Sequence, residues 1–415
     1  MNQNHGGQAE SATEARIRSV GLELRKALVP IMSEIAGPSP RPSRLAERLE
    51  IDKSLASKLS RAFRTEDPLE FMHTVPAPAG LGIFLSAAAR ARVPPGMCTR
   101  ARQGIDRFQA LIDETPGGRA TLNAAISASS PDARIRNERS AKQSVYRAMS
   151  YLLGIQCESM ANAFVMRPSE KTGMVDAIDI SHRIAMRRLR PTAPVGLFSH
   201  RVHGQEGDEP AQQPGLRTLD GELAEDVHSF FLPEYCSNPL PSMDIYRNGS
   251  QTTIALSKDG PPPESPFDLT FATVIQDAME RYRSPRYRHE WRIYLLHCPC
   301  KSLVQDVFIR DDLYAGTVPE ISLHIPSPRG PVTVRHPGDF GTMNTMDMTM
   351  PIEQLGMGLA SVDVKETPAY SSLLRDAFDR VGWDPSRYRA YRMRTTYPVP
   401  MIYINWWFEL PEPPA

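Results

Sequence analysis

Apolar residues recur at intervals of three and four positions along the first third of the chain. The first such run covers residues 14–36, and its apolar members are Ile17, Val20, Leu24, Leu28, Ile31 and Ile35. This spacing predicts an amphipathic helix with one buried face, which Pro30 should kink or divide. The same period predicts helices over 69–92, with a turn at 76–78, and over 100–130, followed by a longer helix over 134–157. Residues 1–13 are small and polar, and we expect a disordered tail there.

The pattern changes near residue 160 to short apolar runs that are bounded by turn residues. Their length and β-branched content predict strands at 163–166, 174–180, 252–256, 291–296, 303–309, 321–325 and 332–335. Helical periodicity returns at 268–282 and 371–381, and an aromatic, strand-like segment covers 397–410. The expected fold is therefore multidomain, with an N-terminal all-α part followed by an α+β region.

The pattern of residues 43–64 predicts two short helices that are joined by a tight turn. Ser43 can cap the first helix, and residues 50–52 form the turn before a second helix that Asp52 can cap. The inward positions are Leu45, Ala46, Leu49, Ile51, Leu55, Ala56, Leu59 and Phe63. The outward positions of the second helix are Lys53, Ser54, Ser57, Lys58, Ser60, Arg61 and Arg64. Because lysine and arginine contact phosphates and guanine edges, this outward face indicates a DNA recognition helix.

The segment Ser-Arg-Leu-Ala-Glu-Arg-Leu-Glu-Ile-Asp-Lys-Ser-Leu-Ala-Ser-Lys-Leu at residues 43–59 resembles the helix-turn-helix of IclR-type winged-helix transcriptional regulators. That family shows a similar Leu-Ala pair, a leucine before the turn, and Lys-Ser at the start of the recognition helix. The resemblance, which lies within residues 43–64, implies base and phosphate contacts by Lys53, Ser54, Ser57 and Lys58. Glu50 stands where the family has a turn glycine, and residues 67–78 lack the hairpin pattern of a wing.

The charge of the chain is balanced as a whole but is concentrated at this motif. The 415 residues hold 48 Lys and Arg against 48 Asp and Glu, which argues against a polybasic protein that coats nucleic acid. Residues 41–64 nevertheless contain seven basic and three acidic residues, a net charge of +4. The candidate DNA contacts are Arg44, Lys53, Ser54, Ser57, Lys58, Arg61 and Arg64.

The cysteines and the N-terminus bear on the expected compartment. The five cysteines are dispersed through a long chain, so they do not form a disulfide framework. The first eleven residues contain no apolar segment of a secretory signal, and no window of about 18 apolar residues predicts a membrane span. We therefore expect a cytoplasmic protein that does not enter a membrane.

Other candidate chemistry in the chain is weaker. His297, Cys298 and Cys300, with His289 nearby, are residue types that bind zinc, but no second cysteine pair completes a site, and thiols buried in a strand are the simpler interpretation. The basic runs 134–147 and 183–190 fit either further phosphate contacts or solvated faces. Tyr403, Trp406, Trp407 and Phe408 fit a ligand pocket, a dimer seam or a strand packed on a helix. We assign no catalytic residue, metal or cofactor.

These observations predict a DNA-binding transcriptional regulator. We expect a helix-turn-helix domain at 14–130, a connecting helix at 134–157, and an effector and dimerisation region at 160–415 that forms one or two subdomains. Its expected partners are double-stranded DNA, a small-molecule effector and a second copy of the chain, because two half-sites match a dimer. One alternative is an enzyme in residues 160–415 with an N-terminal partner-binding module, and another is a scaffold whose helical motif docks a protein.

Overall fold

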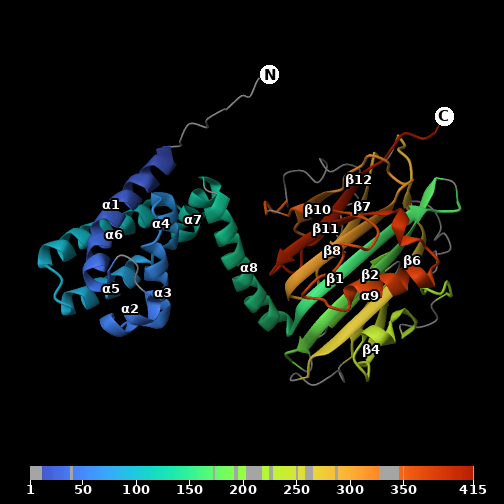
Figure 1. Cartoon of the computed structure of the whole chain (residues 1–415), viewed down its shortest axis with the longest axis horizontal. Helices are drawn as coiled ribbons and strands as arrows, with labels where there is room; N and C mark the ends of the chain where they lie inside the picture. The colour runs from blue at the N-terminus through green and yellow to red at the C-terminus, as the bar shows by residue number, and fades with distance from the viewer. Residues whose placement is uncertain are drawn as a thin grey trace. The chain divides into compact units, whose positions relative to one another are not determined.

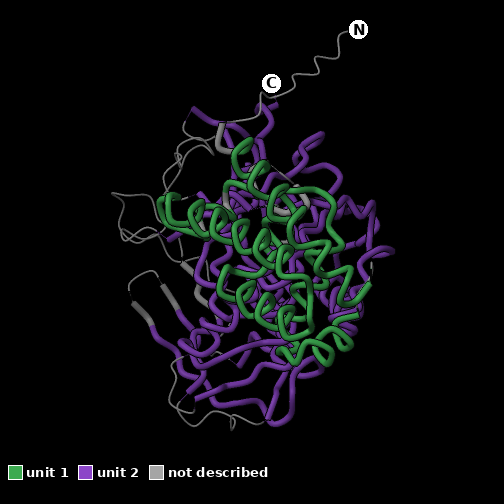
Figure 2. The backbone as a smooth tube through the Cα atoms, turned by 90° about the vertical axis from the view of Figure 1, so that its left-hand side faces the viewer, with its two compact units in different colours: residues 1–138 green, residues 139–415 purple. Residues whose placement is uncertain are grey.

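The computed structural model describes residues 12–37, 41–129, 131–171, 173–190, 195–201, 217–223, 228–248, 251–257, 265–285, 288–326, 345–348 and 350–414. The chain divides into two compact units, residues 1–138 and residues 139–415 (Figure 2). The first unit is helical among its described residues, and the second combines β-sheets with helical segments. The predicted order, helices first and an α+β region second, is confirmed.

The first unit contains α1 (Ala12–Ala36), α2 (Pro42–Leu49), α3 (Lys53–Ala62), α4 (Pro68–Thr74), α5 (Pro78–Arg90), α6 (Pro95–Glu114) and α7 (Gly118–Ser129) (Figure 1). Helix α1 begins at Ala12, inside the expected tail, whereas residues 1–11 lie outside the described part of the chain. It runs through Pro30 without being divided, because its apolar face is held by contacts with α4 and α6. A single core collects Leu24, Leu28 and Phe108, all fully buried.

Close packing of α1 depends on two glycines. A Cβ atom added to Gly21 would lie 2.6 Å from the carbonyl oxygen of Pro68 at the start of α4. A Cβ atom added to Gly104 on α6 would lie 3.3 Å from Leu24 Cδ1. The backbones of α4 and α6 therefore approach α1 more closely than a larger side chain at either glycine would allow.

Helix α8 (Pro131–Leu153) contains the boundary between the units and leads into the first strand. Its second half packs within the second unit, where the Tyr146 and Tyr397 rings lie 5.4 Å apart and Lys142 Nζ donates to Thr395 Oγ1 over 3.3 Å. The helix ends before Gly154, which has the left-handed φ of 70° that favours glycine at a helix end. The predicted connecting helix is therefore too long at its end, because residues 155–157 belong to a strand.

The second unit is organised around a six-stranded sheet in the order β10-β11-β8-β1-β2-β6. Its strands are β1 (Ile155–Pro168), β2 (Met174–Arg188), β6 (Phe267–Glu280), β8 (Cys300–Arg310), β10 (Ile352–Met357) and β11 (Tyr388–Thr396). Neighbours are antiparallel except β1 and β8, which are parallel. The short 3₁₀ helices η1 (His228–Phe230), η2 (Pro233–Tyr235) and η4 (Pro385–Arg387) lie in connections between the strands and helix of this unit.

Different elements cover the two faces of this sheet. On one face lies α9 (Tyr370–Arg380) (Figure 1). Phe378 of this helix packs with Val165 of β1 in one apolar cluster. The other face shares a cluster that includes Phe164 and Trp406 with two three-stranded sheets. One of these sheets has the strand order β7 (His289–Leu295), β12 (Tyr403–Glu409) and β9 (Glu320–His324). The other has the order β3 (Val195–Arg201), β5 (Gln251–Leu256) and β4 (Met243–Asn248). Adjacent residues such as Phe164 and Val165 thus reach opposite cores, as the two-residue period of a strand requires.

Most strand predictions agree with this fold, and one predicted helix is wrong. The segments predicted at 163–166, 174–180, 252–256 and 303–309 lie within β1, β2, β5 and β8, and residues 291–296 and 321–325 overlap β7 and β9. Residues 332–335 lie outside the described part of the chain. Residues 268–282, predicted to be helical, form β6, which pairs with β2 from Phe267 to Glu280. That strand is buried on both faces over much of its length, so its apolar residues do not alternate as those of a half-buried strand do.

Candidate nucleic-acid interface

Helices α2 and α3 pack through the apolar positions that the sequence pattern marks as inward. Leu45, Leu49, Ala56 and Leu59 are all buried and belong to the core of the helical unit. The turn between the helices closes when Ile51 N donates to Ala46 O over 3.1 Å. Glu50 adopts the left-handed region, with φ 53° and ψ 45°. The position where IclR-type regulators carry a glycine therefore has the backbone conformation that favours glycine.

The two helix starts differ in how far they follow the sequence prediction. Asp52 caps α3 as predicted, because its Oδ1 accepts a hydrogen bond from Ser54 N over 2.7 Å. Hydrogen bonds from the Ser54 side chain and from the Ser54 backbone lower the pKa of Asp52. The cap expected from Ser43 is wrong, since α2 begins at Pro42 with Arg41 in the capping position and no side-chain cap. Proline suits a first helical position because it has no N–H that needs a partner, so the helix starts before Ser43.

The predicted contact residues gather on one exposed surface, with one correction. Arg44, Lys53, Ser54, Lys58, Arg61 and Arg64 are exposed, and Ser57 is half-buried. Ser60, which the pattern placed outward, is only 1% exposed. It follows Ala56 by four positions and Leu59 by one, and the 100° step of a helix turns it toward the core. We name the exposed side chains Arg44, Lys53, Ser54, Ser57, Lys58, Arg61 and Arg64 the α3 surface.

Several cationic side chains on the α3 surface have no ion-pair partner, whereas other exposed arginines of the same unit do. Among the described residues, Arg44, Lys53, Lys58 and Arg61 have no ion-pair or hydrogen-bond partner for their side chains. In contrast, Arg16 pairs with Glu114, Arg107 pairs with Glu23, and Arg18 pairs with both Glu14 and Asp67. The charges of Arg44, Lys53, Lys58 and Arg61 are therefore not neutralised by the described part of their own chain, and they can act on an external anion.

An open hollow of about 500 Å³ borders the α3 surface. Ser57, Arg61 and Arg64 line it on the side of α3, and Pro42 lines it at the start of α2. Glu66 and Glu70 also line it. The lining of the hollow is thus polar and of mixed charge.

The segment that follows α3 is helical. Pro68 opens α4, and Asp67 caps it by accepting a hydrogen bond from Glu70 N over 2.8 Å. Helix α5 follows after three residues, so residues 68–90 contain no β-wing within the described structure. The lack of a hairpin pattern in the sequence at 67–78 agrees with this arrangement.

The cysteines of the second unit that were considered as zinc ligands are buried. Cys298 and Cys300 are buried, and burial raises the pKa of the Cys298 thiol to about 12. Burial lowers the pKa of His297 to about 4, and the positive charge of Arg183 acts in the same direction. Within the described residues, no three His, Cys, Asp or Glu side chains form a group that could hold a metal ion. The interpretation of Cys298 and Cys300 as buried thiols agrees with the structure.

The basic run at 183–190 contributes mainly to the interior. Arg183 and Arg188 are 5% and 1% exposed. Arg183 donates to Leu197 O, and Arg188 Nη1 donates to Ser257 O over 2.5 Å. These two arginines therefore form neither a phosphate-contacting face nor a solvated one, because they satisfy the carbonyl oxygens of neighbouring strands.

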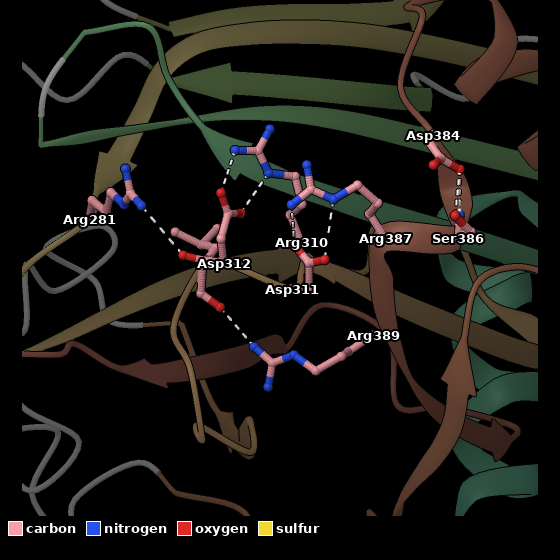
Figure 3. Close-up of polar contacts among 9 residues, drawn as sticks. Arg281, Arg310, Asp311, Asp312, Asp384, Ser386, Arg387 and Arg389 are labelled. Atoms are coloured by element: carbon pink, nitrogen blue, oxygen red, sulfur yellow. Dashed lines mark hydrogen bonds and ion pairs between the residues drawn. The ribbon is translucent and has the colours of Figure 1, made fainter.

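Arginines on the surface of the second unit are paired where they cluster. Arg310 donates two hydrogen bonds to Asp312 over 2.6 and 2.7 Å, and Arg387 donates two to Asp311 over 2.7 and 3.2 Å (Figure 3). Arg389 Nη2 binds the carbonyl oxygen of Leu313 over 2.7 Å. This cluster fixes the turn that follows β8. The charges of Arg310 and Arg387 are neutralised by carboxylates, unlike those of the unpaired cations on the α3 surface.

The aromatic segment near the C-terminus is structural. Trp406 is fully buried and donates to Gln305 Oε1 over 3.0 Å, and Trp407 donates to Ser322 Oγ over 2.6 Å. Strand β12 lies between β7 and β9 and packs against the six-stranded sheet, so the expected packing on a helix is wrong. The alternation of Ile404, Trp406 and Phe408 toward that sheet accounts for their burial.

None of the described helices is by itself long and apolar enough to cross a membrane. Helices α4 and α5 together, bent by 90° at their junction, meet the length and composition of a span, but their apolar residues Phe71, Phe84 and Leu85 are buried in the helical core. No family model matches the chain, and comparisons with the curated proteins and with the solved structures give no significant match.

Proposed function

We propose that this chain is a sequence-specific DNA-binding transcriptional regulator in which α2 and α3 form a helix-turn-helix and α3 is the recognition helix. One observation carries the proposal: the α3 surface is cationic, exposed and largely unpaired, while the opposite side of the same two helices is buried in the core. A plain helical hairpin needs the buried side but does not need four unpartnered cations on the other.

Residue types on the α3 surface suit the major groove. Helix α3 has ten residues and is about 15 Å long, which matches the length of groove that a recognition helix follows. We assign base-edge contacts to the N-terminal residues Lys53, Ser54 and Ser57, since the first turns of a recognition helix reach deepest. Lys58 and Arg61 follow along the helix, and Arg64 lies just after its end. With Arg44 they are assigned to phosphates on either side.

The second unit is proposed to supply dimerisation and effector sensing. A recognition helix of ten residues contacts few base pairs, and a homodimer doubles the contacts on two half-sites. A small-molecule effector would then change the spacing or the population of the DNA-binding arrangement. An enzyme built on His297 and Cys298 is not proposed, because Cys298 is buried and its raised pKa disfavours the thiolate.

Binding of the full chain to duplex DNA across a salt series tests the proposal. The probes are fluorescent duplexes from the region upstream of the coding sequence and scrambled duplexes of the same composition. We expect preferential binding to the upstream duplex, and we expect Lys53→Ala/Lys58→Ala/Arg61→Ala to lose that preference and to have a salt slope smaller by about three.

The matched control is Arg16→Ala/Arg107→Ala, which removes exposed arginines that are already paired with Glu114 and Glu23. This control variant should bind as the wild type does. Equal binding of the wild type and the triple variant, with circular dichroism showing both folded, would rule out α3 as the recognition helix. Loss of a protein partner in the triple variant, without DNA binding by either protein, would favour the scaffold alternative.

A further inference from the structure

A second group of arginines without an ion-pair partner lies on α5, on α6 and in the connection between them. Residues 71–105, which run from α4 to the middle of α6, contain four arginines and neither aspartate nor glutamate, so this stretch carries a charge of +4. The four are Arg90, Arg92, Arg100 and Arg102, and all are exposed. No ion pair involves any of them among the described residues.

Contacts within the unit place this hairpin next to the helix-turn-helix. Helix α2 contacts both α3 and α5 (Figure 1). Arg90 Nη2 donates to Leu49 O at the end of α2 over 3.5 Å, and Arg48 is exposed beside it. A Cβ atom added to Gly80 on α5 would lie 3.3 Å from Leu55 of α3. The two cationic surfaces therefore belong to neighbouring helices of one packed unit.

Small exposed side chains on α5 allow a partner to approach the backbone of this helix. The exposed residues of α5 before Arg90 are uncharged and include the small residues Ser86 and Ala89 together with Ile83, which is 55% exposed. Arg102 Nη1 lies 4.0 Å from the position of a Cβ atom on Gly82. Small side chains let a partner approach the helix backbone, and arginines on both sides can then reach its anionic groups. We name Arg48, Arg90, Arg92 and Arg102 with the exposed side of α5 the α5 surface.

We propose that the α5 surface is a second DNA-contacting surface, which binds the phosphate backbone next to the segment that α3 reads. This inference rests on the proposed function and assigns a separate role to separate residues. The α3 surface supplies sequence preference, whereas the α5 surface supplies affinity that is independent of sequence. Guanidinium groups bind phosphate oxygens through two parallel hydrogen bonds, and four arginines without a carboxylate partner suit a regularly spaced polyanion.

The salt dependence of binding separates the two surfaces. Each phosphate that a cation neutralises adds about 0.9 to the slope of log K against log salt. Arg92→Ala/Arg102→Ala should therefore lower the slope by about two and weaken binding on the order of 50-fold at 0.1 M salt. The ratio of affinities for the upstream and scrambled duplexes should stay the same. Arg90 is left in place because its hydrogen bond to Leu49 O supports α2.

The experiment measures fluorescence anisotropy of the full chain with the two duplexes between about 0.05 and 0.3 M salt, a range over which the slope is resolved. The proteins are the wild type, Arg92→Ala/Arg102→Ala, and the paired-arginine control Arg16→Ala/Arg107→Ala. Thermal unfolding by circular dichroism checks that each variant is folded. The α5 surface is supported if the salt slope decreases by about two only in Arg92→Ala/Arg102→Ala and this variant keeps the preference for the upstream duplex.

The outcomes for the two proposals are distinct. If the wild type prefers the upstream duplex and Arg92→Ala/Arg102→Ala has an unchanged slope, the α5 surface is not a DNA contact and the regulator stands. The wild type could instead bind both duplexes equally while the salt slope of that variant is still smaller by about two. This result would support the α5 surface as a DNA contact and would rule out sequence-specific regulation. A wild type that binds neither duplex overturns both.

Discussion

Arg392 on β11 and Asp306 on β8 are cross-strand partners joined by two parallel hydrogen bonds inside the second unit. Arg392 Nε lies 2.8 Å from Asp306 Oδ1, and Arg392 Nη2 lies 2.6 Å from Oδ2. Both side chains are nearly excluded from solvent, at 7% and 0% exposure. Arg392 also donates to Val362 O over 2.8 Å, so the pair attaches the connection that precedes α9 to the sheet.

Removing one member of this pair should destabilise the second unit strongly. Arg392→Met leaves the Asp306 carboxylate buried without its cation, and the expected loss of unfolding free energy is about 3–5 kcal/mol. The double variant Arg392→Met/Asp306→Leu should recover much of that loss, because it buries no lone charge. Urea unfolding followed by circular dichroism measures both. A double variant less stable than the single one would show that the geometry of the pair, rather than its charge balance, holds this region.

Glu50 should be replaceable by glycine with a gain in stability. Its left-handed φ of 53° costs a residue with a Cβ atom about 1 kcal/mol, and glycine adopts this region freely. We expect Glu50→Gly to raise the unfolding free energy of the helical unit by up to about 1 kcal/mol and to remove a negative charge beside the α3 surface. Denaturant unfolding compares it with Glu47→Gly, which lies within α2 and should destabilise. A higher unfolding free energy for Glu47→Gly together with a lower one for Glu50→Gly would contradict the turn geometry.

Gly21 should not tolerate even one added carbon. A Cβ atom there would lie 2.6 Å from Pro68 O and 2.5 Å from Met72 Cγ, so α4 would have to move away from α1. We expect Gly21→Ala to lower the unfolding free energy by about 1–3 kcal/mol despite the better helix propensity of alanine. Gly96→Ala is the matched control, since nothing lies within 4 Å of a Cβ atom at that helical position. Thermal unfolding should show a loss of stability in Gly21→Ala and none in Gly96→Ala.

His182 should make the stability of the second unit depend on pH. Burial lowers the pKa of His182 from 6.5 to about 4, and its Nδ1 lies 2.7 Å from Thr270 Oγ1. Between these two pKa values the unfolded chain binds a proton that the folded chain does not. The unfolding free energy contributed by this group therefore falls as the pH drops from about 6.5 to about 4, by about 3 kcal/mol in total.

His182→Asn keeps a hydrogen-bond donor near Thr270 but does not titrate in this range. Its unfolding free energy, measured by urea at several pH values, should decline less steeply with acidification than that of the wild type. The difference between the two proteins should be confined to the window from about pH 6.5 to pH 4. Parallel curves for both proteins would mean that another group controls the acid response.

The sequence by itself determined the features that depend on neighbours along the chain. The three- and four-residue spacing located the helices of the first unit, and Asp52 is the cap of α3 that its position beside the Lys-Ser pair predicts. The cationic outward face of α3 follows from the same period. These features arise within one or two helical turns, where local propensity and side-chain spacing control the structure.

Only the tertiary structure decided what depends on partners distant in sequence. Residues 268–282 have a helical pattern but form β6, because β2 supplies backbone partners along its length. Arg183 and Arg188 look like a surface run, yet they are buried because carbonyl oxygens of Leu197 and Ser257 lie within reach. The contrast between paired and unpaired arginines in the helical unit also required coordinates, since Arg107 meets Glu23 across 84 positions of sequence. Ion pairing and strand pairing are decided by proximity in space, which a linear pattern of residue types does not record.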